Sequence, residues 1–219
     1  MHTRTEQITR RCFDAIFAAI VLIALAPLFA LIALLILIED GRPVLFVQQR
    51  VGRGGRPFRM FKFRSMKNGS PGRSITASGD PRVTRTGALL RKLKLDEFAQ
   101  FFNVLKGDMS LCGPRPEVPR YVDLSDPLWR QVLEDRPGIT DPASLVFRDE
   151  EQILGAANDP ELAYRESILP EKLRISARYL RSRTPWSDLK LIYLTARCAL
   201  SPGRTDRRSI ELAVFPGGV

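Results

Sequence analysis

The stretch Ala15–Ile38, AIFAAIVLIALAPLFALIALLILI, runs for 24 residues without a charged or polar side chain. As a single helix it would be about 36 Å long, enough to cross a hydrocarbon core of about 30 Å. Pro27 lies near its centre, where it removes one helical hydrogen bond and clashes with the carbonyl four residues earlier. The stretch therefore predicts a membrane anchor that is kinked or broken at Pro27.

Two forms of anchor remain open from these residues alone. The halves 15–26 and 28–38 would each cover only about 17–18 Å as helices, so a sharp bend would return the chain to the face it entered. A kinked spanning helix is equally compatible, because transmembrane helices tolerate proline. A signal peptide is rejected, because the apolar run continues for eleven residues beyond Pro27 without a polar break.

Charge is distributed unevenly along the rest of the chain. Residues 41–94 carry 14 Lys and Arg against one acid, Asp80, a net charge of +13 that exceeds the +10 of the whole protein. Residues 123–161 carry ten acids against three arginines. The cations after the anchor predict a cytoplasmic body at the membrane surface that handles negatively charged partners. The anchor disfavours nucleic acid as that partner.

Residue counts exclude several kinds of site. His2 is the only histidine, so Ser-His-Asp and Cys-His catalysis and histidine-ligated zinc are excluded. Cys12, Cys112 and Cys198 lie far apart, which indicates a reducing compartment and no metal cage. Any catalysis must use carboxylates, arginines, lysines or a bound metal.

Local patterns predict the elements of the body. Residues 44–49 and 58–63 are aromatic and β-branched runs joined by turn glycines, which is typical of a β-hairpin. Residues 68–81 predict a loop, and helices are expected over 87–94, 96–106, 170–179 and 186–200. The last helix carries Trp186, Leu189, Ile192, Tyr193 and Ala196 on one side. That side indicates either core packing, the commoner case, or a helix lying on lipid.

Asp96 and Glu97 open a helix directly after the cations Arg91, Lys92 and Lys94. One interpretation is structural, because acids favour helix N-termini. The other is chemical: a carboxylate among cations stays ionised and can attack phosphorus, and a second carboxylate can hold Mg²⁺. Guanidinium groups match phosphate in bidentate geometry. Candidate phosphate clamps are Arg91, Arg115 and Arg148, although the last could instead pair with the acids at 149–151.

Several short motifs occur in an order that matches a known protein family, although no single motif would be sufficient to identify it. They are Pro43–Phe46 with Gln48–Gly52, Phe58–Met66 (FRMFKFRSM), Arg91–Asn103 with its Leu-Asp-Glu, Lys106–Leu111 (KGDMSL), Gly113–Glu117 (GPRPE) and Arg136–Thr140 (RPGIT). Over roughly residues 10–200 the chain resembles the monotopic bacterial phosphoglycosyl transferases, also called the bacterial sugar transferase family.

The resemblance implies transfer of a sugar 1-phosphate from a nucleotide diphosphate sugar, expected to be a UDP-sugar, to a polyprenyl phosphate such as undecaprenyl phosphate. This would be the first membrane step of exopolysaccharide or glycoconjugate synthesis. It implies that Asp96 is the nucleophile, that a covalent aspartyl-phosphosugar forms, and that nucleoside monophosphate is released. Glu97, together with Asp96, would hold Mg²⁺. The residues implied to bind phosphate or substrate are Lys62, Arg64, Arg91, Arg115 and Arg148.

The resemblance also implies an architecture of class α+β. A re-entrant helix–break–helix anchor, bent at Pro27 in the bacterial inner membrane, would precede a small mixed catalytic domain on the cytoplasmic face, with a β-hairpin and short amphipathic helices. The expected boundaries are 1–40 for the tail and anchor, 41–202 for the catalytic domain and 203–219 for a C-terminal tail. Membrane lipid and a second copy of the chain are expected partners.

Two positions depart from the family pattern. Many members have serine before the anchor proline, whereas this chain has Ala26. After Thr140 the usual continuation is glycine, with glutamine four residues past the threonine, but this chain reads Asp141-Pro142-Ala143-Ser144. Arg148 keeps the family offset. The departures indicate a subgroup and leave the sugar open. The alternative functions are a non-enzymatic membrane-surface adaptor and a glycosyltransferase that moves the sugar without its phosphate.

Overall fold

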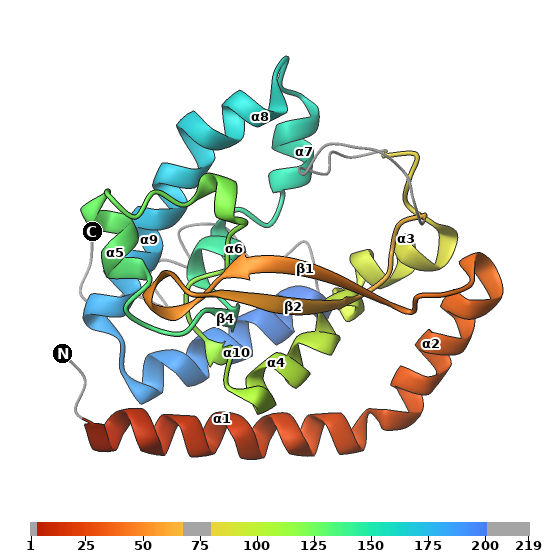
Figure 1. Ribbon diagram of the computed structural model, residues 1–219, viewed down its shortest axis with the longest axis horizontal. Helices are drawn as coiled ribbons and strands as arrows, with labels where there is room; N and C mark the ends of the chain where they lie inside the picture. The colour runs from red at the N-terminus through yellow and green to blue at the C-terminus, as the bar shows by residue number, and fades with distance from the viewer. Residues whose placement is uncertain (1–3, 68–79, 201–219) are drawn as a thin grey trace.

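The computed structural model describes residues 4–67 and 80–200 (Figure 1). Within them helices and short strands are mixed, as the expected α+β class requires. The predicted loop over 68–81 lies outside the described residues except for its last two positions, and the predicted tail 203–219 lies wholly outside them.

The segment predicted to be the anchor forms two helices, α1 (Arg4–Ala24) and α2 (Ala26–Asp40), that meet at a bend of 62°. The chain turns at Leu25, and Pro27 occupies the first turn of α2, where its missing N–H is not needed. The bend thus lies two residues before the predicted break and forms without a capping hydroxyl at Ala26. No single helix in the described ranges is long and apolar enough to cross a membrane, although the bent pair together passes that test.

The first helix is longer than the apolar run, and its polar start is attached to the body. Arg11 donates to the carbonyl oxygens of Val104 (2.6 Å) and Leu105 (2.7 Å). Asp14, 5% exposed, accepts from Ser110 Oγ at 2.6 Å. These contacts hold α1 along the body, as Figure 1 shows.

The β-hairpin predicted from the sequence is confirmed. Strands β1 (Leu45–Val51) and β2 (Pro57–Phe63) pair antiparallel, with Leu45 opposite Phe63 and Val51 opposite Pro57. The second edge of β2 is occupied by the side chain of Asn103, which accepts from Phe61 N (3.0 Å) and donates to Arg59 O (2.7 Å). This amide fixes the helix that carries it against the hairpin.

The segment that follows the hairpin places the acidic pair. Helix α3 (Arg85–Lys92) leads to a 3₁₀ turn, η2 (Leu95–Ala99), which continues into α4 (Gln100–Lys106). The helix expected over 96–106 is therefore present, but its first turn is wound more tightly as 3₁₀, and Lys94, with a left-handed φ of 57°, separates it from α3. Strands β3 (Ser110–Cys112) and β4 (Gly138–Thr140) then form a short parallel pair.

The helices of the C-terminal half cover this pair. The remaining elements are η1 (Arg53–Gly55), η3 (Pro119–Tyr121), α5 (Pro127–Val132), α6 (Pro142–Val146), α7 (Glu150–Gly155), α8 (Pro160–Ala163), the π-turn η4 (Tyr164–Ile168), α9 (Leu169–Ser182) and α10 (Pro185–Leu200). The predicted helices over 170–179 and 186–200 are α9 and α10, so both are confirmed.

Of the two interpretations of the apolar side of α10, core packing holds for Ile192, which packs against the core beside the buried Leu191 and Leu194. The rest of that side is mostly exposed, with Trp186, Leu189 and Tyr193 at 66%, 49% and 63%. Both faces of this helix are largely apolar, so periodicity alone does not tell which one meets the body.

Candidate active site

The acidic pair lies in the first turn of η2, where the chain enters the helix that packs on β2. Glu97 receives two cations from distant segments. Lys62 Nζ of β2 lies 3.1 Å from Oε1, and Arg115 Nη1 donates to Oε2 at 3.0 Å while its Nη2 donates to Oε1. Arg115 therefore grips the carboxylate bidentately. The structure brings together three residues that the resemblance assigned to one site.

Electrostatics separate the two carboxyl groups. Burial alone would raise the pKa of Glu97, but the charges of Arg115 and Lys62 outweigh it and hold that pKa well below its usual value. The same pairing raises the pKa of Arg115. Glu97 is thus a fixed anion, whose Oε1 accepts two donors and whose Oε2 accepts one.

Asp96 has the opposite environment. It is 7% exposed, and its Oδ1 is enclosed without a hydrogen-bond partner. Burial, reinforced by the negative charge of Glu97, raises the pKa of Asp96, and the nearby cations only partly oppose this. The sequence predicted that these cations would control the pKa of Asp96, whereas in the fold burial outweighs them. A carboxylate with few donors keeps its lone pairs available for reaction.

Arg115 is held by a rigid loop. Pro114 and Pro116 flank it and restrict the backbone. Arg50 Nη1 donates to the backbone carbonyl oxygen of Pro116 at 3.0 Å, and Val51 N donates to the backbone carbonyl oxygen of Glu117 at 2.8 Å. The loop is therefore clamped onto the end of β1, which fixes the direction of the guanidinium.

Sequence reasoning missed the residues that hold this loop. Glu117 lies 3.6 Å from Arg50 Nη1 through its Oε2, and its Oε1 accepts from the hydroxyl of Tyr164, which lies in the π-turn. Glu117 and Arg50 both stand inside recognised motifs. The tyrosine gives no local signal, because only the fold brings position 164 to position 117.

The other candidate arginines occupy different places. Arg91 in α3 pairs with Glu151, a half-exposed acid, and one of its electrostatic neighbours is Asp96. Arg148 Nη2 donates to the carbonyl oxygen of Cys198 at 3.2 Å, toward the end of α10. Neither shows a described contact with Glu97.

Arg64 lies at the anchor and not with Glu97. Its Nη2 donates to the carbonyl oxygens of Asp40 and Gly41, both at 2.7 Å, and lies 3.1 Å from the carboxylate of Asp40. It therefore caps the C-terminus of α2. These contacts therefore do not support the prediction that Arg64 binds substrate.

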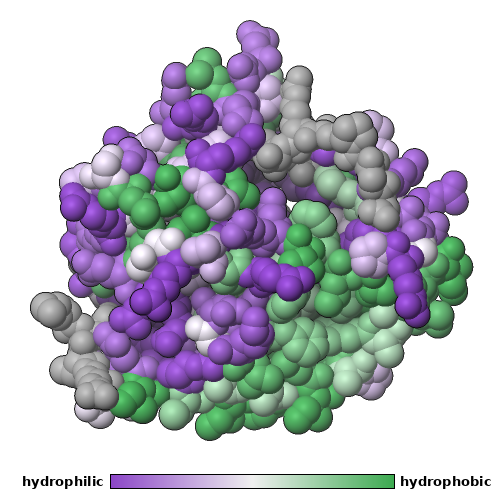
Figure 2. All heavy atoms as spheres, in the orientation of Figure 1, coloured by the Kyte–Doolittle hydropathy of each residue, from purple (hydrophilic) through white to green (hydrophobic). Residues whose placement is uncertain are grey.

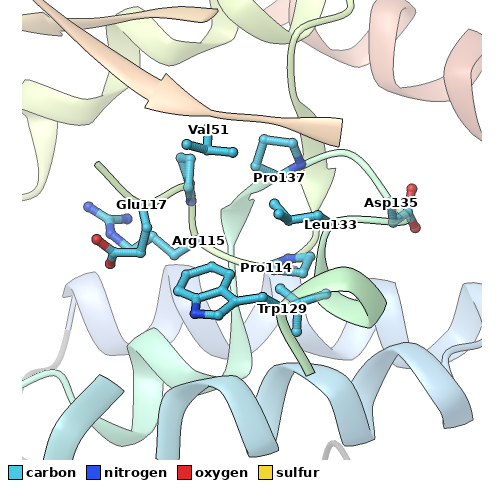
Figure 3. Close-up of a pocket in the computed structure, with 10 residues that line it drawn as sticks. Val51, Pro114, Arg115, Glu117, Trp129, Leu133, Asp135 and Pro137 are labelled. Carbon is cyan, nitrogen blue, oxygen red and sulfur yellow. The ribbon is translucent and has the colours of Figure 1, made fainter. Parts of the chain in front are cut away.

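A small hollow lies beneath the Arg115 loop (Figure 3). Its volume is about 10 Å³, room for roughly one water molecule. Figure 3 shows Trp129, Leu133 and Val51 closing it, while the side chains of Arg115 and Glu117 lie to one side. The hollow is a packing feature of the loop and is too small for a sugar.

The departure after Thr140 has a structural role. Asp141 is buried and caps α6, accepting from Ser144 N at 3.1 Å, and it also accepts from Ser176 Oγ at 3.1 Å. Its burial raises its pKa. The aspartate and serine that replace the family residues thus form a helix cap together.

Among the described residues no group of three or more His, Cys, Asp or Glu side chains could hold a metal ion by itself. Two carboxylates are sufficient for Mg²⁺, which takes one or two protein oxygens and otherwise binds water and substrate phosphates. Glu97 Oε2 accepts one described hydrogen bond, and a carboxylate oxygen has two lone pairs. The donor set of Glu97 and Asp96 therefore fits such an ion.

Comparisons with known proteins agree with the motifs. The model of the family described as bacterial sugar transferase matches residues 5–202. The chain is 38% identical over 199 residues to a UDP-N-acetylgalactosamine-undecaprenyl-phosphate N-acetylgalactosaminephosphotransferase of Aeromonas hydrophila, covering 88% of this chain and 44% of that protein.

Two UDP-glucose:undecaprenyl-phosphate glucose-1-phosphate transferases are also similar. The one from Escherichia coli (strain K12) is 32% identical over 199 residues, covering 87% of this chain and 40% of that protein. The one from Caulobacter vibrioides is 34% identical over 197 residues, covering 88% and 70%. The chain thus spans less than half the length of the Aeromonas and Escherichia relatives. With its motifs, its paired carboxylates and a match over nearly its whole described length, the chain belongs to the bacterial sugar transferase family.

Proposed function

We propose that this chain transfers a sugar 1-phosphate from a UDP-sugar to undecaprenyl phosphate and releases UMP. The names of the similar proteins support the donor and acceptor classes. The observation that carries the proposal is the divided acidic pair, in which Arg115 and Lys62 both pair with Glu97 while the neighbouring Asp96 carboxylate has no described ion pair and its enclosed Oδ1 accepts no hydrogen bond.

In the first step an oxygen of Asp96 attacks the phosphorus that carries the sugar. A new oxygen–phosphorus bond forms, and the bond from that phosphorus to the bridging oxygen of the diphosphate breaks. UMP leaves with the bonding electrons. The aspartate becomes an acyl phosphate that carries the sugar. Because an ionised carboxylate has no proton to lose before it attacks, this step needs no histidine as a general base.

In the second step an oxygen of undecaprenyl phosphate attacks the same phosphorus, and the bond to Asp96 breaks. The products are the free carboxylate and an undecaprenyl diphosphate sugar. Arg115 and Lys62 bring positive charge beside the acidic pair, which would oppose the negative charge that develops on the phosphoryl oxygens. Arg91 pairs with Glu151 in this structure and would have to leave that acid to assist. Both substrates are anionic, which agrees with the cationic stretch 41–94.

We include Mg²⁺ in the proposal, held by Glu97 with Asp96 beside it. When bound, the ion supplies positive charge to the diphosphate and its leaving group. The chain's own contribution is the orientation of Glu97 by the arginine fork and the lysine.

We further propose that the bent helices form a re-entrant anchor in the inner membrane, with the body on the cytoplasmic face. Arg11 and Asp14 near the start of the anchor, and Asp40 at its end, all contact the body. These contacts support the proposal that both ends of the anchor lie on one side of the membrane.

The surface supports this arrangement. On α1 the residues Ile8, Ile16, Ile20 and Ile23 are 57–76% exposed. Figure 2 shows a broad apolar area on the side of the molecule formed by α1 and α2, and polar residues over much of the remainder of this face. An apolar surface of this kind is normally covered by lipid or protein. The exposed aromatic side of α10 would add an interfacial contact with lipid. A homodimer stays a prediction, to be tested by native mass in detergent.

The central experiment incubates purified full-length protein with a panel of nucleotide sugars, undecaprenyl phosphate and Mg²⁺, and measures UMP release. Wild-type protein should release UMP and gain the mass of a phosphosugar, and Asp96→Asn should do neither while staying in the membrane. Release of UDP would favour a glycosyltransferase that moves the sugar without phosphate. Salt-sensitive lipid binding without any nucleotide release would favour a membrane adaptor.

Topology has its own test. A cysteine at Thr5, in a variant without Cys12, should react with an impermeant thiol reagent only after the cytoplasmic face is exposed. Labelling from the periplasm would contradict the re-entrant anchor.

A further inference from the structure

The η2–α4 segment packs on strand β2 and carries three buried polar residues. These are Asp96, Gln100 and Asn103, spaced four and three residues apart, with exposures of 7%, 1% and 0%. Gln100 and Asn103 lie in α4 and are neighbours on its surface. Asp96 lies four positions before Gln100 in the tighter 3₁₀ turn, so the three residues form a buried polar row along the segment that starts at the proposed nucleophile.

Hydrogen bonding along this row is unequal. Asn103 is satisfied at both ends of its amide by the backbone of β2. Gln100 has no hydrogen-bond partner at either Nε2 or Oε1, and the same is true of Asp96 Oδ1. Two buried side chains of this segment thus leave three enclosed polar atoms unpaired.

Unpaired buried polar atoms are uncommon in folded proteins and require an explanation. The two groups are chemically complementary, because a carboxylate oxygen accepts and an amide nitrogen donates two hydrogens. They lie four positions apart in one continuous helical segment, and no hydrogen bond joins them in this structure.

We propose that Gln100 is a positioning residue for Asp96, and that its amide donates a hydrogen bond to Oδ1 when the diphosphate of the donor is bound. This inference rests on the proposed function of Asp96. The hydrogen bond fixes the rotation of the carboxylate. It holds the enclosed Oδ1 in place and leaves Oδ2 as the atom that attacks phosphorus.

The neighbouring cations do not perform this task. Lys62 and Arg115 are committed to Glu97, and Arg91 is committed to Glu151. Within the described part of the η2–α4 segment, Gln100 is the buried side-chain donor without a partner.

The test replaces Gln100 by methionine, which has similar volume and no strong donor. The rate constant for UMP release in a single turnover should fall about 10- to 100-fold, because misorientation of a reacting group has effects of this size. KM for the UDP-sugar should stay within about twofold. The melting temperature should be unchanged or higher, because two unpaired polar atoms are removed.

Gln100→Glu tests whether the hydrogen-bond donor or the size of the side chain matters. Glutamate has the same length as glutamine, but in its ionised form it only accepts hydrogen bonds. The rate constant for UMP release should therefore fall at least as far as in Gln100→Met. Asn103→Leu is the control for a purely structural amide. It should lower the melting temperature, because it leaves Phe61 N and Arg59 O unpaired, and it should not reproduce the pattern of a slower rate at unchanged stability.

The outcomes separate this inference from the function on which it rests. If Asp96→Asn is inactive and Gln100→Met releases UMP at the wild-type rate, the positioning role is wrong and the proposed function stands. A lower melting temperature in Gln100→Met with a proportionate loss of active protein would assign Gln100 a structural role and also overturn the inference. If Asp96→Asn still turns over, the proposed function fails first.

Discussion

Replacing Arg115 by lysine should slow transfer about 10- to 150-fold in kcat/KM. The guanidinium makes two hydrogen bonds to Glu97, one to each carboxylate oxygen, and lysine can make one. Losing a hydrogen bond to a charged group costs about 1.5–3 kcal/mol, and each 1.36 kcal/mol is a factor of ten in rate. The pair is mostly shielded, with side-chain exposures of 27% and 14%, so solvent screens it little.

The assay is a double-mutant cycle on UMP release, using Arg115→Lys, Glu97→Gln and both together. If the two side chains act as one unit, the double variant should be little worse than the poorer single variant, with a coupling of about 1.5–3 kcal/mol. Arg120→Lys is the matched control. It alters another Arg–Glu pair whose side chains are 45% and 40% exposed, and it should stay within about twofold of wild type. Effects that add within about 0.5 kcal/mol would refute the reasoning.

Three further predictions concern stability and the membrane. Asp80 accepts hydrogen bonds from Arg82, which lowers the pKa of Asp80 from 3.8 to about 2. The stability that this carboxylate contributes is complete above pH 4 and is lost as the pH falls toward 2. Acid-unfolding curves of wild type and Asp80→Asn should therefore converge near pH 2, and a constant difference down to pH 1 would contradict this. Gly87→Ala places a Cβ 2.0 Å from Ser65 O and should destabilise by about 3 kcal/mol or more, lowering the melting temperature by roughly 6–12 °C, and an unchanged melting temperature would be inconsistent with this packing. Trp186→Ser with Tyr193→Ser should reduce retention on lipid vesicles in high salt without changing the melting temperature, because both rings are exposed; equal retention would show that α10 does not touch lipid.

Local sequence was sufficient for the features that depend on neighbouring residues. The 24 apolar residues and Pro27 predicted a broken anchor, because helix length and the missing proline N–H are local properties. The alternating runs and turn glycines predicted the hairpin of β1 and β2. The motif around Asp96 and Glu97 identified the acidic pair, since its residues are adjacent in the chain.

Tertiary structure decided the features that depend on distant residues and on burial. Lys62 and Arg115 reach Glu97 from 35 and 18 positions away, and no local pattern specifies that meeting. The burial that raises the pKa of Asp96 is likewise a property of the packed hairpin, and the same packing takes Arg64 to the end of α2. Propensity and periodicity encode which elements form, whereas desolvation and long-range pairing exist only once those elements have packed. The sequence alone therefore predicted which residues carry the proposed chemistry, and the fold determined which carboxylate pairs with cations and which keeps an unpaired oxygen.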